Sequence, residues 1–145
     1  MKRLIYSLAF LVTVTAAGAS VSAQQSGGVR VEFQGPGGHS SGAYGRVSAL
    51  HAAARAVILI QKALPAGSYQ ITNLTGGNSV NSIASDGLIE LKLNAANAAA
   101  YQELVAAVTK AATEGAAAEN AFRGVKPGEL TSGAPATVRT TVKPF

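Results

Sequence analysis

The sequence has no cysteine, and only two histidines stand among its 145 residues. Without cysteine the chain can form no disulfide and offers no thiolate to a metal. It also contains no His-x-Asp and no Glu-Glu pair, so it lacks the usual ligands of a zinc site. We therefore expect no metal, no cofactor and no hydrolase activity from this chain alone.

Charged residues are few as well, at 13% of the sequence, with a formal net charge of +5. Two of the positive charges belong to Lys2 and Arg3 at the start of the chain. The remaining lysines and arginines are scattered and form no run or stripe of the kind that binds a phosphate backbone. A nucleic-acid partner is therefore not expected.

Residues 1–23 have the pattern of a secretory signal peptide. Lys2 and Arg3 form its positive start, an apolar stretch follows, and the small residues at 21–23 match a cleavage site. The apolar stretch is shorter than the roughly 20 residues that a helix needs to cross a bilayer, so no stable membrane anchor is expected. We predict cleavage after Ala23 and a periplasmic or secreted location.

After a short polar linker at residues 24–28, the hydrophobic pattern divides the chain into strands and helices. Strands are predicted where apolar and polar residues alternate, and helices where apolar residues recur at helical spacing. The predicted strands cover residues 29–34, 68–75, 87–93 and 136–143. The predicted helices cover residues 47–64 and 98–114 and are stopped by Pro65 and Gly115. The segments without regular elements are a Gly- and Pro-rich loop at residues 35–45 and the unassigned residues 116–135.

These elements follow the order β-α-β-β-α-β within one domain, residues 29–145. That order favours an α+β two-layer sandwich, in which both helices cover one face of a four-stranded antiparallel sheet, as in ferredoxin-like folds. The first and third strands are expected in the centre of the sheet. The second strand, residues 68–75, is left on an edge, where it can pair with another chain.

The first predicted helix has more apolar surface than one sheet face can bury. Besides the stripe that faces the sheet, a second stripe carries Ala49, Ala52, Ala56, Leu59 and Ala63. A second helix, from this chain or from a partner, should cover it. Together with Tyr69 and Ile71 of the edge strand, this stripe is predicted to form the interface of a homodimer.

His39 is the residue best placed for chemistry. It lies between Gly38 and Ser40 in the predicted loop, with no apolar register to bury it, so its imidazole is available to a ligand. His51 falls on the polar side of the first helix. The carboxylates, Glu119 among them, show no converging pair for acid–base chemistry and are expected on the solvated surface.

Two motifs carry a resemblance to a known family. Residues 31–41 read VEFQGPGGHSS before a predicted helix, and residues 76–83 read GGNSVNSI before a predicted strand. In this order and spacing they resemble the dimerisation, or lid, domain of the zinc metallopeptidases that include glutamate carboxypeptidase, aminoacylase and succinyl-diaminopimelate desuccinylase. The resemblance covers nearly all of the chain after the signal peptide. In that family the lid is inserted in a separate catalytic domain that holds two zinc ions.

The resemblance implies roles for two residues. His39 matches the family's lid histidine, which reaches the partner's active site and helps to polarise the scissile carbonyl, and Asn81 matches an asparagine that contacts substrate. Family lids pair through the first helix and its neighbouring edge strand, the two elements singled out above. Because antiparallel neighbours place their loops at one end of a sheet, we expect His39 and Asn81 on the same side of the domain and open to solvent.

The chain departs from the family pattern at two places. Ala84 replaces the proline that follows the second motif. The Asp-x-Arg that commonly ends the next strand is replaced by Lys92-Leu93-Asn94, so the arginine that would hold a substrate carboxylate is missing. The scaffold is thus retained while part of the implied substrate contacts is lost.

The missing zinc ligands and the retained scaffold favour an exported, non-catalytic module that forms a homodimer. Two alternatives stay open. In the first, residues 35–45, His39 and Asn81 bind a peptide or an acyl-amino acid. In the second, the chain is a trans-acting lid that completes the site of a separate zinc hydrolase.

Overall fold

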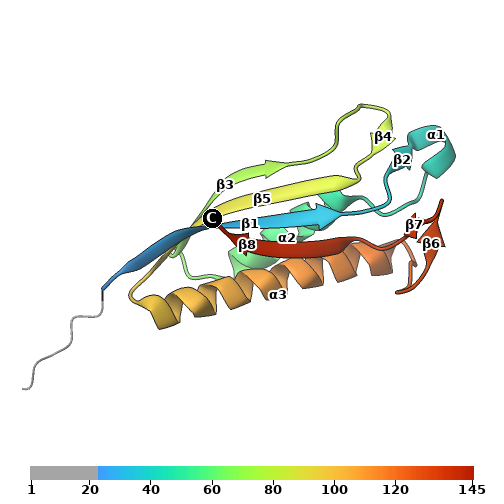
Figure 1. Ribbon diagram of the computed structural model, residues 1–145. Helices are drawn as coiled ribbons and strands as arrows, with labels where there is room; N and C mark the ends of the chain where they lie inside the picture. The colour runs from blue at the N-terminus through green and yellow to red at the C-terminus, as the bar shows by residue number, and fades with distance from the viewer. Residues whose placement is uncertain (1–22) are drawn as a thin grey trace, which may run out of the picture.

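The computed structural model describes residues 23–145, which form a two-layer α+β sandwich (Figure 1). The expected signal peptide, residues 1–23, lies outside the described residues except for Ala23. Among the described residues, no helix combines the length and the apolar character needed to cross a membrane. The α+β class and the antiparallel sheet predicted from the sequence are confirmed.

Four strands form the main sheet, and each runs antiparallel to its neighbours. In sheet order they are β3 (Tyr69–Thr75), β5 (Asp86–Ala95), β1 (Gln25–Gln34) and β8 (Arg139–Pro144). β1 and β5 pair from Gln25 opposite Ala95 to Gln34 opposite Asp86. The first and third predicted strands are therefore central, and β3 lies on an edge, as predicted.

β1 includes residues 25–28, which the sequence suggested as a linker. They pair with residues 92–95 at the end of β5. Gly27 and Gly28 have no side chains, so the alternation that marks a strand is absent there. A Cβ on Gly27 would lie 2.6 Å from the hydroxyl oxygen of Tyr101, so glycine lets this ring pack against the strand.

Two long helices, α2 (Ala49–Ala63) and α3 (Ala98–Phe122), cover the same face of the sheet (Figure 1). Each begins at a capping side chain, Ser48 for α2 and Asn97 for α3, which accepts a hydrogen bond from a backbone N–H in the first turn. α2 packs mainly over β5, while α3 packs over β1, β5 and β8. The two helices also contact each other along their length.

Five short elements gather at one end of the sandwich, opposite to the end where β1 begins (Figure 1). They are β2 (Gly38–His39), α1 (Ser40–Ala43), β4 (Ser82–Ile83), β6 (Leu130–Thr131) and β7 (Ala134–Pro135). β2 pairs with β4, and β6 pairs with β7. Elements of two to four residues are too short to show a hydrophobic period, so the sequence did not reveal them.

The core lies between the sheet and the helices. Alternate residues of the two central strands are buried, namely Val29, Val31 and Phe33 in β1 and Ile89, Leu91 and Leu93 in β5. The helices supply mostly alanine to this core, with Ile60 from α2 and Val108 from α3. Small helix residues allow the helices to lie close to the sheet and to each other.

The other face of the sheet is polar. Nη2 of Arg30 donates to Glu90 at 2.6 Å, and Asn73 donates to the same carboxylate at 3.4 Å. The hydrogen bond from Arg30, and then the one from Asn73, hold the pKa of Glu90 below its usual value. Lys143 pairs with Glu32 at 3.0 Å on the same face. The alternation therefore gives one covered and one solvated sheet face.

Gly115 lies inside α3 and does not end it, which corrects the predicted helix end. A Cβ at position 115 would lie 2.8 Å from the nitrogen of Ala56 and 2.9 Å from the carbonyl oxygen of Ala52. Glycine is required there because α3 crosses α2 in close contact. The helix then continues to Phe122.

Three alanines of the α2 stripe, Ala49, Ala52 and Ala56, are covered within the same chain, so their assignment to a dimer interface is wrong. For Leu59, which is half-buried, and Ala63, which is exposed, it stays a prediction. Ala49, Ala52 and Ala56 are fully buried within the single chain. Leu59 and Ala63 line a groove together with residues of α3. The second helix that the stripe required is therefore the chain's own.

Candidate functional site

His39 and Asn81 meet at the short ribbon that β2 and β4 form beyond the main sheet. In this ribbon His39 lies opposite Ser82, and the N–H of Ser40 donates to the carbonyl of Asn81 at 2.9 Å. His39 Nε2 lies 3.2 Å from Asn81 Nδ2, and both side chains are exposed. The predicted proximity and exposure are confirmed, while a role in substrate binding stays a prediction.

Both ring nitrogens of His39 have polar neighbours. Its Nδ1 lies 2.8 Å from Ser41 Oγ, and its Nε2 faces the side-chain nitrogen of Asn81, which can only donate. Nδ1 also accepts from the backbone N–H of Ser41 at 3.3 Å, so both ring nitrogens of His39 face groups that can donate. The Asn81 side-chain oxygen accepts in turn from the Ser79 hydroxyl. These bonds lie at the surface, where a ligand can replace them.

Two glycines set the direction in which the chain leaves β1. Gly37 and Gly38 have φ angles of 64° and 137°, in the region that favours glycine. A Cβ on Gly38 would also lie 2.6 Å from the Cβ of Ala43. Arg46 braces this turn, because its Nη1 donates to the carbonyl of Gly37 at 3.1 Å. The GPGG sequence therefore presents His39 at the outer end of the domain.

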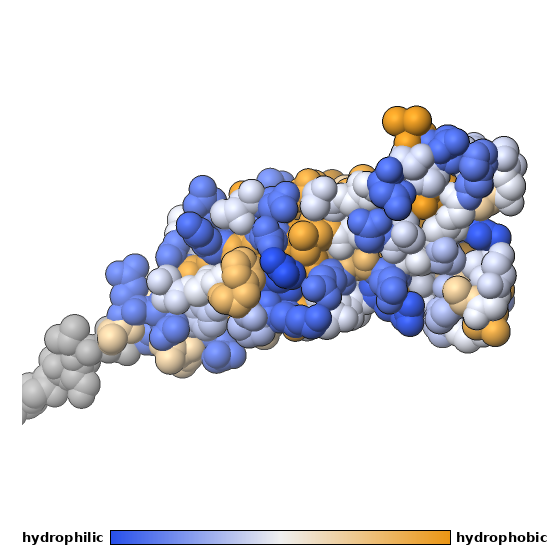
Figure 2. Space-filling model, turned by 45° about the horizontal axis from the view of Figure 1, so that its top comes forward, coloured by the Kyte–Doolittle hydropathy of each residue, from blue (hydrophilic) through white to orange (hydrophobic). Residues whose placement is uncertain are grey.

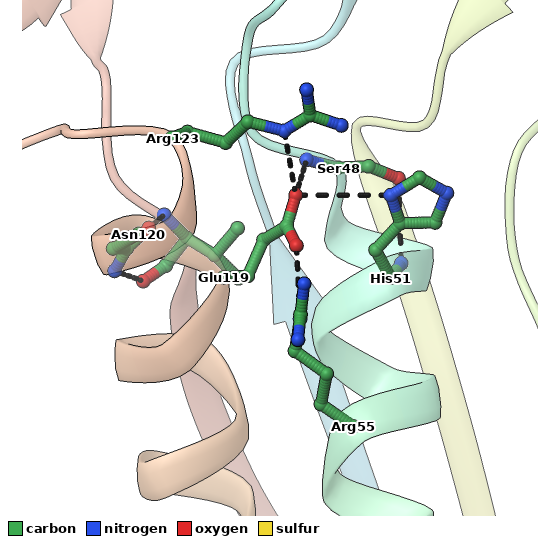
Figure 3. A network of polar contacts seen from close by, with 7 residues as sticks. Ser48, His51, Arg55, Glu119, Asn120 and Arg123 are labelled. Atoms are coloured by element: carbon green, nitrogen blue, oxygen red, sulfur yellow. Dashed lines mark hydrogen bonds and ion pairs between the residues drawn. The ribbon is translucent and has the colours of Figure 1, made fainter.

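A second polar cluster centres on Glu119, which is fully buried where the end of α3 meets the start of α2 (Figure 3). Its Oε1 accepts from the Ser48 N–H at 3.2 Å and from Arg123 Nε at 3.4 Å, and its Oε2 accepts from Arg55 Nε at 3.1 Å. His51 Nδ1 lies 3.8 Å from Oε1. A buried carboxylate is tolerated only with such partners.

The expectation of a solvated Glu119 is wrong, and the error follows from ending the helix at Gly115. Once α3 continues, the buried stripe of Val108, Ala112 and Ala116 reaches position 119 at the next helical step. This continued period is the signal in the sequence that places Glu119 between the helices. His51 does lie on the exposed side of α2, as expected, although it reaches the edge of the cluster.

The family model of the peptidase dimerisation domain matches residues 21–120, which is more than half of the chain. The chain belongs to the peptidase dimerisation domain family. The matched range contains both motifs on which the resemblance was based, and it contains His39 and Asn81. No curated protein matches the chain.

Solved structures share the fold of this dimerisation domain at low sequence identity. A tripeptidase from Staphylococcus aureus has a TM-score of 0.60 at 18% identity, over 86% of this chain and 30% of its own. An aminobenzoyl-glutamate utilization protein from Klebsiella pneumoniae has a TM-score of 0.60 at 17% identity, over 84% and 28%. A hydantoinase/carbamoylase family amidase from Burkholderia ambifaria has a TM-score of 0.60 at 18% identity, over 86% and 28%. The chain thus spans less than a third of each of these proteins.

The two departures from the family pattern lie in different parts of the dimerisation domain. Ala84 is buried, and its carbonyl accepts from the N–H of Ala49 at 3.0 Å, which ties the second motif to the start of α2. Asn94, where the resemblance implies an arginine, pairs with Ser26 at the opposite end of the sheet from His39. Among residues 23–145, no three His, Asp or Glu side chains gather in a group that could hold a metal.

The dimerisation domain keeps one apolar side exposed, formed by α2 and β3. The side of α2 that faces away from α3 carries Leu50, Ala54, Val57 and Ile58, of which Ile58 is 52% exposed. Within residues 23–145, β3 pairs only with β5, and its Leu74 is 43% exposed. Figure 2 shows hydrophobic patches between the polar side chains when the β3 side of the domain is turned forward. An open strand edge and an apolar helix side therefore adjoin.

Proposed function

We propose that this chain is an exported, non-catalytic module that forms a homodimer through β3 and the outward side of α2. The family match carries the proposal, because residues 21–120 correspond to a peptidase dimerisation domain. Residues 1–23, with the pattern of a signal peptide, support export. The absence of cysteine and the presence of only two histidines support a module without a zinc site of its own.

The geometry of one edge suits two copies of the chain. A twofold axis beside β3 places two β3 strands antiparallel, so that their open edges pair and the sheets join into one. The same rotation brings the outward sides of the two α2 helices together. Ala54 is small enough for a close approach there, and Ile58 loses its exposed apolar surface. Tyr69 and Ile71, which are half-buried on β3, remain in the proposed interface.

A charge on α2 tests this surface. Ala54→Glu places an unpaired carboxylate in the proposed interface, where its burial costs several kcal/mol, so we expect monomers at micromolar concentration. Ala117→Glu is the matched control, because Ala117 is an exposed alanine on α3. Light scattering measures the molar mass of both variants. The same mass for the two variants would contradict the proposed surface.

The exposed pair of His39 and Asn81 favours a second role, which is contact with a small peptide or acyl-amino acid, alone or in the site of a separate zinc hydrolase. Its imidazole and amide lie 3.2 Å apart and together can bind the carbonyl group of such a ligand. Titration with N-acetylglutamate, followed by the NMR signals of His39 and Asn81, tests this role. Signal changes confined to other residues would argue against it.

A further inference from the structure

A hollow of about 610 Å³ opens beside the ribbon of His39 and Asn81. Its walls are residues 44–46, 48, 50 and 51 around the start of α2, residues 76–80 and 82–84 at the second motif, and Arg123 at the end of α3. This volume is in the range of pockets that bind small molecules. Neither His39 nor Asn81 lines the hollow, so it is distinct from the pair described above.

The residues that line the hollow include two arginines, Arg46 and Arg123, together with His51, and no acidic residue. Glu119 lies behind the wall, fully buried, and its single negative charge is shared by Arg55 and Arg123. Arg46 donates to a carbonyl and a hydroxyl, both of them neutral. The hollow therefore has an excess of positive charge, which attracts an anion.

Arg123 is held in position for such an anion. Its Nε donates to Glu119, and its guanidinium lies 5.0 Å from the centre of the Phe122 ring. Figure 3 shows the two terminal nitrogens of Arg123 turned away from Glu119. A guanidinium held in this way loses little freedom on binding, and its planar fork matches a carboxylate.

Apolar side chains stand in the walls as well. Tyr44 is 92% exposed and Val80 is fully exposed, and they belong to two different walls of the hollow. Exposed side chains of this size favour an apolar group that covers them. We infer that the hollow binds a small organic carboxylate with an aromatic or aliphatic group, its carboxylate at Arg123 and His51. The site does not depend on the proposed homodimer.

Titration calorimetry of the purified protein with N-benzoylglycine tests the inference. This compound has a carboxylate and an aromatic ring. The control is N-benzoylglycinamide, called the amide below, in which an uncharged carboxamide of nearly the same shape replaces the carboxylate. We expect the acid to bind with a Kd in the millimolar range or tighter, more weakly at high salt, and the amide to bind roughly tenfold more weakly or worse. Equal binding of acid and amide, or no binding of the acid, would overturn the inference.

Two arginine variants locate the ligand. Arg123→Gln removes a guanidinium that lines the hollow. Arg55→Gln is the matched control, because Arg55 also pairs with Glu119 but does not line the hollow. We expect the first to weaken binding of the acid by roughly tenfold or more and the second to change it by less than about twofold. Circular dichroism checks that both variants fold. The comparison of acid with amide uses the unmodified protein and therefore does not depend on the variants.

Either of two results would remove the ligand from the hollow. Equal losses in the two arginine variants would show that binding depends on the Glu119 cluster as a whole. Loss of binding in His39→Ala, a residue outside the hollow, would place the ligand at the ribbon instead. The inference requires that His39→Ala binds N-benzoylglycine as the unmodified protein does.

Discussion

The protein holds two polar clusters in opposite surroundings. Around Glu119, a carboxylate, two guanidiniums and a backbone N–H are bonded inside the joint between α2 and α3. Around His39, an imidazole, an amide and two hydroxyls are bonded at the exposed ribbon. Water competes for the bonds of the second cluster but is excluded from the buried carboxylate of the first. We therefore expect the loss of Glu119 to destabilise the fold, and we expect the His39 cluster to be available to a ligand.

Breaking the buried cluster should have the largest effect. Glu119→Leu leaves the Ser48 N–H without an acceptor and two guanidiniums beside an apolar side chain, and removing one partner of a buried ion pair costs roughly 3–5 kcal/mol. Arg55 and Arg123 are 38% and 25% exposed, so water offsets part of this loss and we expect the lower end of the range. Urea unfolding followed by circular dichroism measures the free energy.

Glu119→Gln is the matched control, because its amide oxygen can still accept from Ser48 while the charge is gone. It should cost less than Glu119→Leu. If Glu119→Leu loses less than about 1 kcal/mol, the buried cluster does not stabilise the joint between the helices.

Breaking the exposed cluster should have a much smaller effect. His39→Ala and Asn81→Ala each remove one side of a solvated contact, and surface changes of this kind usually shift the free energy of unfolding by less than about 0.5 kcal/mol. Thermal melts of both variants give the comparison with Glu119. A loss on the order of 1–3 kcal/mol in both would assign the pair to the fold and remove the reason for a ligand there.

The smallest effect is expected from Glu90, on the solvated sheet face, and only in acid. Its folded-state pKa is lowered, first by the hydrogen bond from Arg30, so its ionised form stabilises the fold. This contribution is complete above the ordinary glutamate pKa and is lost as the pH falls through the lowered one. Glu90→Gln should therefore flatten the acid side of the melting-temperature profile, whereas Glu103→Gln, on the exposed surface of α3, should not. Parallel profiles for the unmodified protein and Glu90→Gln would contradict this.

The main elements were predictable because long segments keep one hydrophobic period. Val29, Val31 and Phe33 alternate in β1, and the apolar positions of α2 recur at helical spacing, so strand, helix and sheet order followed from local pattern and topology. The ribbon was predictable in part. The strands that adjoin the two motifs placed His39 and Asn81 at one end of the sheet. The pairing of β2 with β4 was not predicted, because strands of two residues show no hydrophobic alternation.

The contact between α2 and α3 was not predictable, because a glycine can either end a helix or allow two helices to pack closely. Gly115 stops a helix in many sequences, but here it lets α3 approach Ala52 and Ala56 closely. That close contact buries Ala52 and Ala56, which the sequence assigned to a partner, and α3 continues past it to Glu119. Local pattern alone cannot tell which surface of a helix a partner chain will cover.

The molar mass of the protein in solution tests the account most directly. Sedimentation velocity over micromolar to submillimolar concentrations should show a species of twice the chain mass, because β3 has an open edge beside the exposed apolar side of α2. Ala54→Glu should return the mass to that of one chain. A single-chain mass for the unmodified protein at every concentration would contradict the proposed homodimer.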